Sequence, residues 1–293
     1  MKLIFTSPFL LVSSYLFCQL PDCDIWLLDI KDSVGRISFH NPVNITSRKG
    51  YDNQPAFSPD GKYILFSSQH DSAGQTDIYK YELATKKITQ FTHTPTSEYS
   101  PTFIPDGKNI SVVMVEKDSA QRLWKFSLSP LKAGNMQCGG CACIMQTVDS
   151  VGYHCWINKD SVAIFVLTKP SFTLQLANIN SQKTQVIADS IGRCMRMKEG
   201  TLWFTTKVNH FHNVYEYNLK TKKITAKGAI ESEDYCFYGN QIWSCSENTI
   251  VSGYMNNKIG SNRIMNLDSY GIMKITRITL SPDGKKIALV SNK

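Results

Sequence analysis

At 293 residues the chain is longer than most single domains, although all-β repeat folds of this size often form one unit. Hydrophobic residues make up 42% and charged residues 19%, which allows a packed core and excludes an intrinsically disordered chain. The formal net charge of +8 comes from scattered lysines and arginines rather than from a basic stripe, so nucleic acid is not an expected partner.

Residues 1–18 have the character of an export signal. After one lysine, an apolar run extends over residues 3–17. This run is too short to span a bilayer, and no later segment is apolar enough to do so. We therefore expect cleavage near Cys18 or Gln19 and a periplasmic or secreted protein that does not span the membrane. Attachment of a lipid to Cys18 is a weaker alternative, because Phe17 is not the small residue that usually precedes a lipid-bearing cysteine.

Predicted strands begin soon after this signal. Residues 24–30 and 36–39 are short segments rich in β-branched and aromatic side chains. A hairpin follows over residues 56–66, and its turn is Ser-Pro-Asp-Gly, in which proline sets φ at the second position and glycine takes the positive φ that closes the turn. Residues 77–83 then repeat the pattern of residues 24–30, and residues 86–91 form the next strand. One repeat therefore contains four strands.

The hairpin recurs along the chain. Residues 103–110 and 279–290 repeat it closely, and weaker turns occur near residues 160, 200 and 240. Further copies of the third strand of the repeat occupy residues 122–128, 173–179 and 213–219. Successive turns are about 40 to 53 residues apart, which is the interval of a four-stranded propeller blade. Six turns predict an all-β fold, a six-bladed β-propeller.

The two ends of the chain are complementary. The last turn is followed by one strand, residues 286–290, whereas residues 24–41 offer two strands without an inner hairpin of their own. We predict that these N-terminal strands complete the C-terminal blade, because pairing them closes the ring and removes open sheet edges. Residues 19–293 then form one propeller domain.

The repeat resembles that of TolB-type propellers, also described as the WD40-like or PD40 repeat. Its pattern runs from an acidic residue through proline and an aromatic residue to Ser-Pro-Asp-Gly-Lys, and residues 52–62 and 98–108 match it. The copy at residues 281–285 lacks the upstream proline. The resemblance implies a six-bladed propeller, but one fold carries many functions. Hydrolases that use such propellers carry a Gly-x-Ser-x-Gly elbow, which this sequence lacks.

The mature chain contains eight cysteines: Cys23, Cys138, Cys141, Cys143, Cys155, Cys194, Cys236 and Cys245. In an exported protein this even number favours disulfides. The cysteines of residues 138–143 are expected to staple a surface loop, and a zinc site that they form with Cys155 or His154 is the alternative. The cysteines at 155, 194 and 236 each precede a turn on an inner strand, where they either pair across blades or fill the centre as buried thiols.

Two histidines, His210 and His212, lie on one side of an extended segment because strand side chains alternate. A metal site needs three or more ligands, and no acidic partner lies near in the sequence. We therefore expect an exposed connector here, and we predict no metal and no cofactor.

The residues that lead into the inner strands are expected to ring the axial opening and to form a binding rim. They are Tyr51, Asp52, Gln54, Glu98, Tyr99, Tyr153, His154, Arg193, Arg196, Glu233, Asp234, Tyr235, Lys274 and Arg277. Tyrosine and arginine are favoured anchors in interfaces, so the rim suits capture of a protein or peptide. The alternative for Asp52 and Glu98 is that they hydrogen-bond to neighbouring backbone groups.

Two functions remain open. The first is a monomeric, non-catalytic binding propeller at the cell envelope, whose partner is an envelope or extracellular protein, a peptide or a glycan. The second is a carbohydrate-active lyase or hydrolase, with Asp52, Glu98, His154 and Glu233 converging in the axial funnel for acid and base catalysis. The sequence shows no nucleophile elbow, no placeable pair of catalytic carboxylates and no phosphate loop, which favours the binding protein. Carboxylates close together in an open funnel would favour the enzyme.

Overall fold

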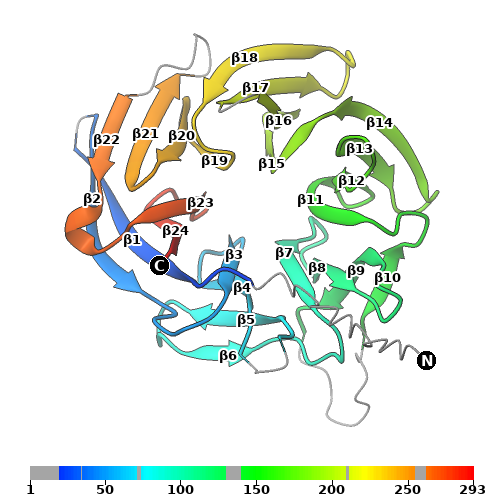
Figure 1. Ribbon diagram of the computed structural model, residues 1–293, viewed down its shortest axis with the longest axis horizontal. Coiled ribbons are helices and arrows are strands. Elements are labelled where there is room, and N and C mark those ends of the chain that lie inside the picture. Colours follow the sequence, from blue (N-terminus) through cyan, green and yellow to red (C-terminus); the bar gives the residue numbers. More distant parts are fainter. Residues whose placement is uncertain (1–19, 34, 71–73, 130–139, 209–210, 255–261) are drawn as a thin grey trace, which may run out of the picture.

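The computed structural model describes residues 20–293 except residues 34, 71–73, 130–139, 209–210 and 255–261. In this part of the chain, six antiparallel sheets of four strands surround a central axis (Figure 1). The predicted six-bladed propeller is therefore confirmed. Residues 1–19 lie outside the described residues, so the export signal, its cleavage and the lipid alternative at Cys18 stay predictions.

Each blade is described from its inner strand outwards. Blade 1 consists of β3 (Asp52–Phe57), β4 (Tyr63–Ser68), β5 (Asp77–Glu82) and β6 (Ile88–Gln90). Blade 2 consists of β7 (Glu98–Phe103), β8 (Asn109–Val115), β9 (Gln121–Ser127) and β10 (Ala142–Met145). Blade 3 consists of β11 (Val151–Asn158), β12 (Ser161–Val166), β13 (Thr173–Asn178) and β14 (Lys183–Asp189).

The second half of the ring repeats this order. Blade 4 consists of β15 (Ile191–Lys198), β16 (Thr201–Val208), β17 (Phe211–Asn218) and β18 (Ile224–Ile230). Blade 5 consists of β19 (Tyr235–Tyr238), β20 (Gln241–Ser246), β21 (Thr249–Tyr254) and β22 (Asn262–Asn266), and the short 3-10 helix η1 (Asp268–Tyr270) follows it. Blade 6 consists of β23 (Lys274–Leu280), β24 (Lys286–Asn292), β1 (Cys23–Ser33) and β2 (Arg36–Asn44).

Blade 6 joins the two ends of the chain. Strand β1 pairs with β24 in antiparallel register, with Trp26 opposite Leu289. The ammonium group of Lys293 lies 3.3 Å from Asp22 and 3.0 Å from Asp24, which adds ion pairs to the backbone ladder. The prediction that the N-terminal strands complete the C-terminal blade is thus confirmed, and the ring closes through this sheet.

The turns follow the chemistry of their residues. In the first hairpin Ser58 Oγ donates to Asp60 (2.7 Å), and the backbone N–H of Lys62 donates back to Ser58 Oγ (3.0 Å). Gly61 adopts a φ of +68°, which a residue with a side chain rarely tolerates. The last hairpin has the same arrangement, with Ser281 Oγ 2.6 Å from Asp283. Identical local chemistry therefore builds the hairpins at both ends of the ring.

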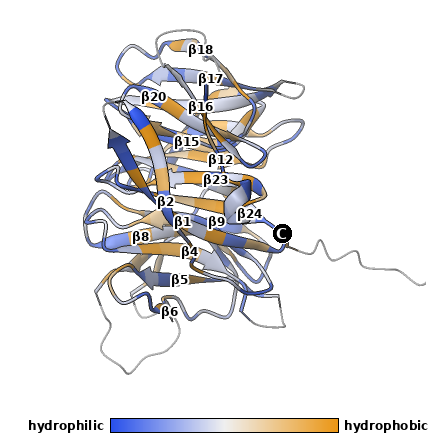
Figure 2. Ribbon diagram, turned by 90° about the vertical axis from the view of Figure 1, so that its left-hand side faces the viewer, coloured by the Kyte–Doolittle hydropathy of each residue, from blue (hydrophilic) through white to orange (hydrophobic). Residues whose placement is uncertain are grey.

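The hydrophobic core lies largely between adjacent blades. Leu28 of β1 is fully buried in a cluster that includes Trp243 and Ile250 of blade 5. Figure 2 views the propeller from the side and shows hydrophobic segments within the strands of blades throughout the disc. Packing between blades thus couples each sheet to its neighbours. Within the described residues, no helix is long and apolar enough to cross a membrane.

Inner strands are irregular near their middle. The register shifts between Asn53 and Ala56 in β3 and between Tyr99 and Thr102 in β7, and β11, β15 and β23 contain similar shifts. An extra residue at such a bulge breaks the alternation of side chains between the two faces of a strand. Consecutive residues of an inner strand can therefore face the propeller axis.

Candidate functional site

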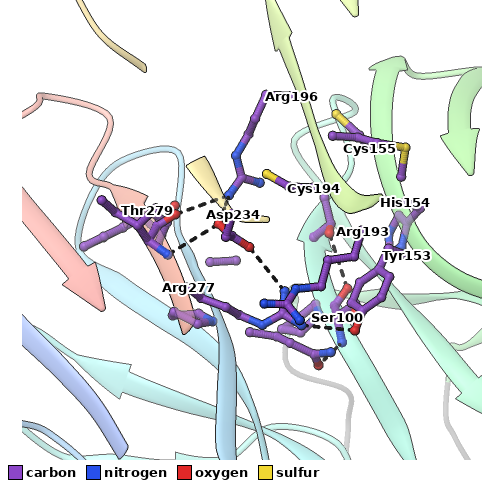
Figure 3. A pocket seen from close by; sticks show the side chains of 18 of the residues that line it. Ser100, Tyr153, His154, Cys155, Arg193, Cys194, Arg196, Asp234, Arg277 and Thr279 are labelled. Carbon is purple, nitrogen blue, oxygen red and sulfur yellow. Dashed lines mark hydrogen bonds and ion pairs between the residues drawn. The ribbon is translucent and has the colours of Figure 1, made fainter. Parts of the chain in front are cut away.

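A cavity of about 370 Å³ lies on the propeller axis, and all six blades contribute to its wall (Figure 3). The wall consists of residues 54–57, 100–103, 153–155, 193–197, 234, 277–280 and 282. Runs of consecutive residues line it because the inner strands are irregular at this level.

The wall changes character along the inner strands. Near the strand irregularities the wall is polar and contains Gln54 and Arg277, whereas nearer the Pro-Asp-Gly turns it contains Phe57, Phe103 and Leu280. These turns lie at one face of the disc, so a ligand that enters from that face meets an apolar layer before a polar one.

A carboxylate between two arginines forms the charged part of the wall. Asp234, whose side chain is 5% exposed, lies 3.6 Å from Arg196 and 3.5 Å from Arg277 (Figure 3). Arg277 also donates to the Tyr153 hydroxyl (3.1 Å), and its guanidinium carbon is 5.2 Å from the centre of that ring, a cation–π distance. Asp234 precedes β19, while the arginines belong to β15 and β23. These ion pairs therefore join blades 4, 5 and 6 at the axis.

A third arginine, Arg193, completes the charged cluster. It donates to the carbonyl oxygen of Thr276 (2.8 Å), and its guanidinium lies 3.3 Å from Glu233. Glu233 also accepts a hydrogen bond from the backbone N–H of Arg193 (2.7 Å). Glu233 is not part of the cavity wall, whose only described carboxylate is Asp234. Three guanidinium groups against two carboxylates leave the cluster with an excess of one positive charge.

The opposite part of the wall is uncharged. His154 Nε2 lies 2.6 Å from Ser111 Oγ, while its Nδ1 is buried without a hydrogen-bond partner among the described residues. Burial lowers the pKa of His154 to about 3, so the imidazole is neutral at physiological pH. Ser100 Oγ is also buried without a partner in the described part of the chain, and the Ser100 backbone N–H donates to Gln54 (2.8 Å).

Cysteines also line the cavity. Burial raises the pKa of Cys155 to about 11 and that of Cys194 to about 12, so both thiols stay protonated and unreactive at neutral pH. The free thiols are Cys23, Cys143, Cys155, Cys194, Cys236 and Cys245. The prediction of disulfides is wrong for these six residues, and on the inner strands the buried-thiol alternative holds. Cys141 is disulfide-bonded, in line with the predicted disulfide in the segment of residues 138–143, and Cys138 lies outside the described residues.

The structure brings seven of the fourteen predicted rim residues into the cavity wall: Gln54, Tyr153, His154, Arg193, Arg196, Asp234 and Arg277. The other seven do not line it: Tyr51, Asp52, Glu98, Tyr99, Glu233, Tyr235 and Lys274. The reason is that, apart from Asp234 just before β19, the wall residues on strands lie along the middle and the ends of the inner strands rather than at their beginnings. A role for any of these residues in binding stays a prediction.

Tyrosines and acids at the strand beginnings are mostly buried. Tyr51 is 6% exposed and its ring contacts that of Tyr99 edge-on, while Tyr235 is fully buried. Asp52 and Glu98 are also fully buried. These buried side chains therefore contribute to packing near the start of the inner strands.

The two buried acids bond to side chains rather than to backbone groups. Asp52 pairs with Arg48 at 2.7 Å. Glu98 accepts hydrogen bonds from Thr92 (2.9 Å) and from Thr94. Burial raises the pKa of Glu98 to about 8, which keeps this carboxyl largely protonated at neutral pH. In the described part of the chain, neither carboxyl accepts a hydrogen bond from a backbone group, so the alternative of backbone partners does not hold.

No group of three or more histidine, cysteine, aspartate or glutamate side chains in the described part of the chain is arranged to hold a metal. His154 bonds to Ser111, and Cys155 is a free thiol. His210 lies outside the described residues, so its pairing with His212 is not described. His212 lies in β17 and is buried, so the prediction of an exposed connector is wrong for this residue.

A sequence signal for the polar level of the cavity does exist. Gln54 and Ser100 have φ values of +59° and +55°, and each precedes a proline, Pro55 or Pro101. Proline within a strand is found at edges or bulges. These Xaa-Pro pairs therefore mark the points at which two inner strands bend towards the axis.

Comparison with known proteins supports the fold. No protein-family model matches the chain. Over 67 residues, or 23% of its length, the chain is 40% identical to the Tol-Pal system protein TolB of Francisella tularensis subsp. mediasiatica (strain FSC147). The matched segment spans only 15% of that relative.

Two solved structures are similar over nearly the whole chain. A protein assigned as TolB from Agrobacterium tumefaciens matches with a TM-score of 0.68 and 12% identity, covering 93% of this chain and 99% of the other. TolB from Acinetobacter baumannii matches with a TM-score of 0.54 and 13% identity, covering 92% of this chain and 64% of the other. Identities this low establish a shared fold alone. Together with the matched segment, they show that this chain is a six-bladed β-propeller similar to the propellers of these TolB structures.

Proposed function

We propose that this chain is a non-catalytic binding module of the cell envelope that holds a segment of a partner protein or peptide in its axial cavity. One observation carries this proposal: Asp234 is the only carboxylate among the described wall residues, and Arg196 and Arg277 both engage it. A carboxylate held between two cations is a poor general base, and no second carboxylate in the wall could act as its partner acid.

The alternative, a carbohydrate-active lyase or hydrolase, requires an acid and a base in the funnel. Asp52 and Glu98 are fully buried outside the wall. His154 is in the wall, but with a pKa of about 3 it is a weak base at neutral pH. These positions and charges favour binding over catalysis.

An envelope location is supported by the matched relative, whose name assigns it to the Tol-Pal system, and by the predicted export signal. We expect the mature chain to act there as a monomer.

Site-directed photo-crosslinking tests the proposal. A photoreactive phenylalanine analogue replaces Phe103 in the cavity wall or, as a control, Val186, which is 59% exposed on the outer strand β14. Each purified protein is mixed with envelope extract of the source cells and irradiated. We expect a discrete protein adduct from position 103 and none from position 186. Equal adducts from both positions would contradict a binding site in the cavity.

An activity assay tests the alternative. The intact protein is incubated with neutral and acidic polysaccharides, and new reducing ends and unsaturated products are measured. We expect neither product. If the native protein releases a product and the Asp234→Asn variant does not, the protein is an enzyme and the proposed non-catalytic function is wrong.

A further inference from the structure

The charges of the axial cavity define the chemical class of its ligand. Arg193, Arg196 and Arg277 line the wall together with one carboxylate, Asp234, and Glu233 balances Arg193 from outside. One positive charge is therefore in excess within a partly buried space. Such a charge is costly to leave without a counter-charge, so the cavity favours a ligand that brings one negative charge.

Arg196 is the most accessible of the three guanidinium groups. Its side chain is 37% exposed, against 25% for Arg193 and 13% for Arg277. Its Nε donates to the carbonyl oxygen of Tyr235 (3.2 Å), and one terminal nitrogen donates to that of Ile278 (3.4 Å). The other terminal nitrogen makes no hydrogen bond to the described residues. A planar guanidinium with free N–H donors is suited to a carboxylate.

Asp234 positions Arg196 and Arg277 but does not use all of their N–H donors. Its oxygens lie 3.6 Å from Arg196 and 3.5 Å from Arg277, whereas charge-assisted hydrogen bonds are about 2.7–2.9 Å long. The two guanidinium groups are thus held on either side of one buried carboxylate and keep donors for a second one. Asp234 is therefore a positioning residue.

The apolar layer of the wall also indicates which kind of anionic ligand fits the cavity. Phe57, Phe103 and Leu280 line the part of the cavity nearest the Pro-Asp-Gly turns, and Phe103 and Leu280 are half-buried whereas Phe57 is 9% exposed. The hydroxyl groups of a sugar bound beside this layer would lose hydrogen bonds to water and gain none from the apolar side chains. Apolar side chains of a peptide bound there would instead be stabilised by burial. A peptide therefore fits this wall better than a uronic-acid oligosaccharide, although both carry carboxylates.

We propose that the axial cavity recognises an acidic peptide segment, in which a carboxylate binds Arg196 and Arg277 and neighbouring apolar side chains contact the apolar layer, chiefly Phe103 and Leu280. The carboxylate is that of an aspartate, a glutamate or a free C-terminus. This inference rests on the proposed binding function and adds the chemistry of its ligand.

Selection from a random dodecapeptide library with free C-termini, performed on the intact mature protein, tests the inference. We expect enriched peptides to share an acidic residue, or the C-terminal carboxylate, next to apolar residues. The best peptide is then synthesised with its acid replaced by the matching amide. Binding to the native protein should weaken by roughly tenfold or more, because a charge-assisted hydrogen bond is lost. This comparison changes only the ligand, so it does not depend on how a protein variant folds.

Protein variants locate the interaction. Arg196→Gln should lose about the same factor for the acidic peptide and little for the amide, and Arg196→Lys should recover part of the binding. Arg122→Gln is the matched control, because Arg122 lies on β9 outside the cavity wall and pairs with Glu116 at 2.6 Å. It should leave binding unchanged, and thermal unfolding confirms that each variant is folded.

The possible outcomes distinguish an error in the proposed ligand class from an error in the proposed binding function. Enrichment of neutral or basic peptides, no enrichment at all, or equal binding of the acid and its amide would overturn the acidic peptide. Binding of a uronic-acid oligosaccharide in place of peptides would overturn it as well. If position 103 still crosslinks a partner in any of these cases, the binding function stands and only the chemistry of its ligand is wrong.

Discussion

Asp52 and Glu98 occupy the same position at the start of consecutive inner strands, but different side chains stabilise them. Arg48, four residues before Asp52, pairs with it at 2.7 Å. Thr94, four residues before Glu98, donates a hydrogen bond to it instead. Both carboxyl groups are fully buried. Hydroxyl groups donate to both acids, Ser68 to Asp52 and two threonines to Glu98, and burial raises the pKa of both. Among the described residues, the difference is that Asp52 also has an ion pair with an arginine.

This difference predicts an unusual pH dependence for Glu98. Burial raises the pKa of Glu98 from about 4.5 to about 8 in the folded protein. A carboxyl with a raised pKa stabilises the folded state fully below its unfolded pKa, and this contribution is lost as the pH rises towards 8. Because glutamine does not titrate, we expect the Glu98→Gln variant not to lose this stability as the pH rises. The melting temperature of the variant minus that of the native protein should be higher at pH 8.5 than at pH 5, by roughly several degrees.

Asp60→Asn is the matched control for this measurement. The Ser58 hydroxyl lowers the pKa of Asp60 by donating a hydrogen bond to it. The stabilisation from Asp60 is therefore present above its unfolded pKa and is lost only as the pH falls below it. The difference between Asp60→Asn and the native protein should stay constant from pH 5 to pH 8.5. A constant difference for Glu98→Gln as well would show that Glu98 does not titrate in this range.

Removal of the cation beside Asp52 should destabilise the fold. In Arg48→Thr the buried carboxylate loses its ion pair, and we expect a loss of about 2–3 kcal/mol in the free energy of unfolding. Arg48→Lys should recover much of this loss because it keeps the charge. Urea unfolding at pH 7 measures both changes. If Arg48→Thr unfolds at the same urea concentration as the native protein, the ion pair contributes nothing.

Two buried serines of blade 2, on β7 and β8, should respond in opposite directions to the same substitution. Ser100 Oγ is buried without a partner among the described residues, so Ser100→Ala removes an unsatisfied group and should stabilise the protein by about 1 kcal/mol. Ser111 Oγ lies 2.6 Å from His154 and accepts a hydrogen bond from the Trp156 indole (2.8 Å). Ser111→Ala leaves both groups unpaired and should cost about 1–3 kcal/mol. Chemical unfolding of the two variants measures the contrast, and equal losses would contradict it.

The central ion-pair cluster should contribute to stability through Asp234. Its side chain is 5% exposed, and Asp234→Asn leaves Arg277, 13% exposed, without a counter-charge. We expect a loss of about 3 kcal/mol in the free energy of unfolding. Glu233→Gln, at a side chain that is 28% exposed, should cost less than about 1 kcal/mol. Urea unfolding measures both variants. A larger loss of stability for Glu233→Gln than for Asp234→Asn would show that Glu233, and not Asp234, is the main stabilising carboxylate of the cluster.

Closure of the ring should depend on packing of β1 against blade 5. Leu28 is fully buried beside Trp243, so Leu28→Ala should lower the free energy of unfolding by about 3 kcal/mol. Ile224→Ala, at a side chain that is 40% exposed on the outer strand β18, is the control and should cost less than about 1 kcal/mol. Thermal and urea unfolding measure both variants. A small loss for Leu28→Ala would mean that blade 6 is stable without this contact.

Repeats in the amino-acid sequence were sufficient to predict the architecture. Turn chemistry is local: the conformation of Gly61 follows from the serine, proline and aspartate before it, and the same residues recur at Gly284. Their spacing determined the number of blades and the surplus strands at the two ends. The closing sheet followed because every strand needs a hydrogen-bonded neighbour.

Only the tertiary structure decided which residues meet on the axis. Arg196 and Arg277 lie on inner strands whose register shifts, and Asp234 lies just before β19, so the charged cluster forms where residues from blades 4, 5 and 6 meet on the axis. Those bulges, the burial of Asp52 and Glu98, and the reduced state of the inner cysteines depend on packing between blades. Local sequence encodes a turn, but it does not encode the register at which six separate strands approach one another, and that register determines the chemistry of the cavity.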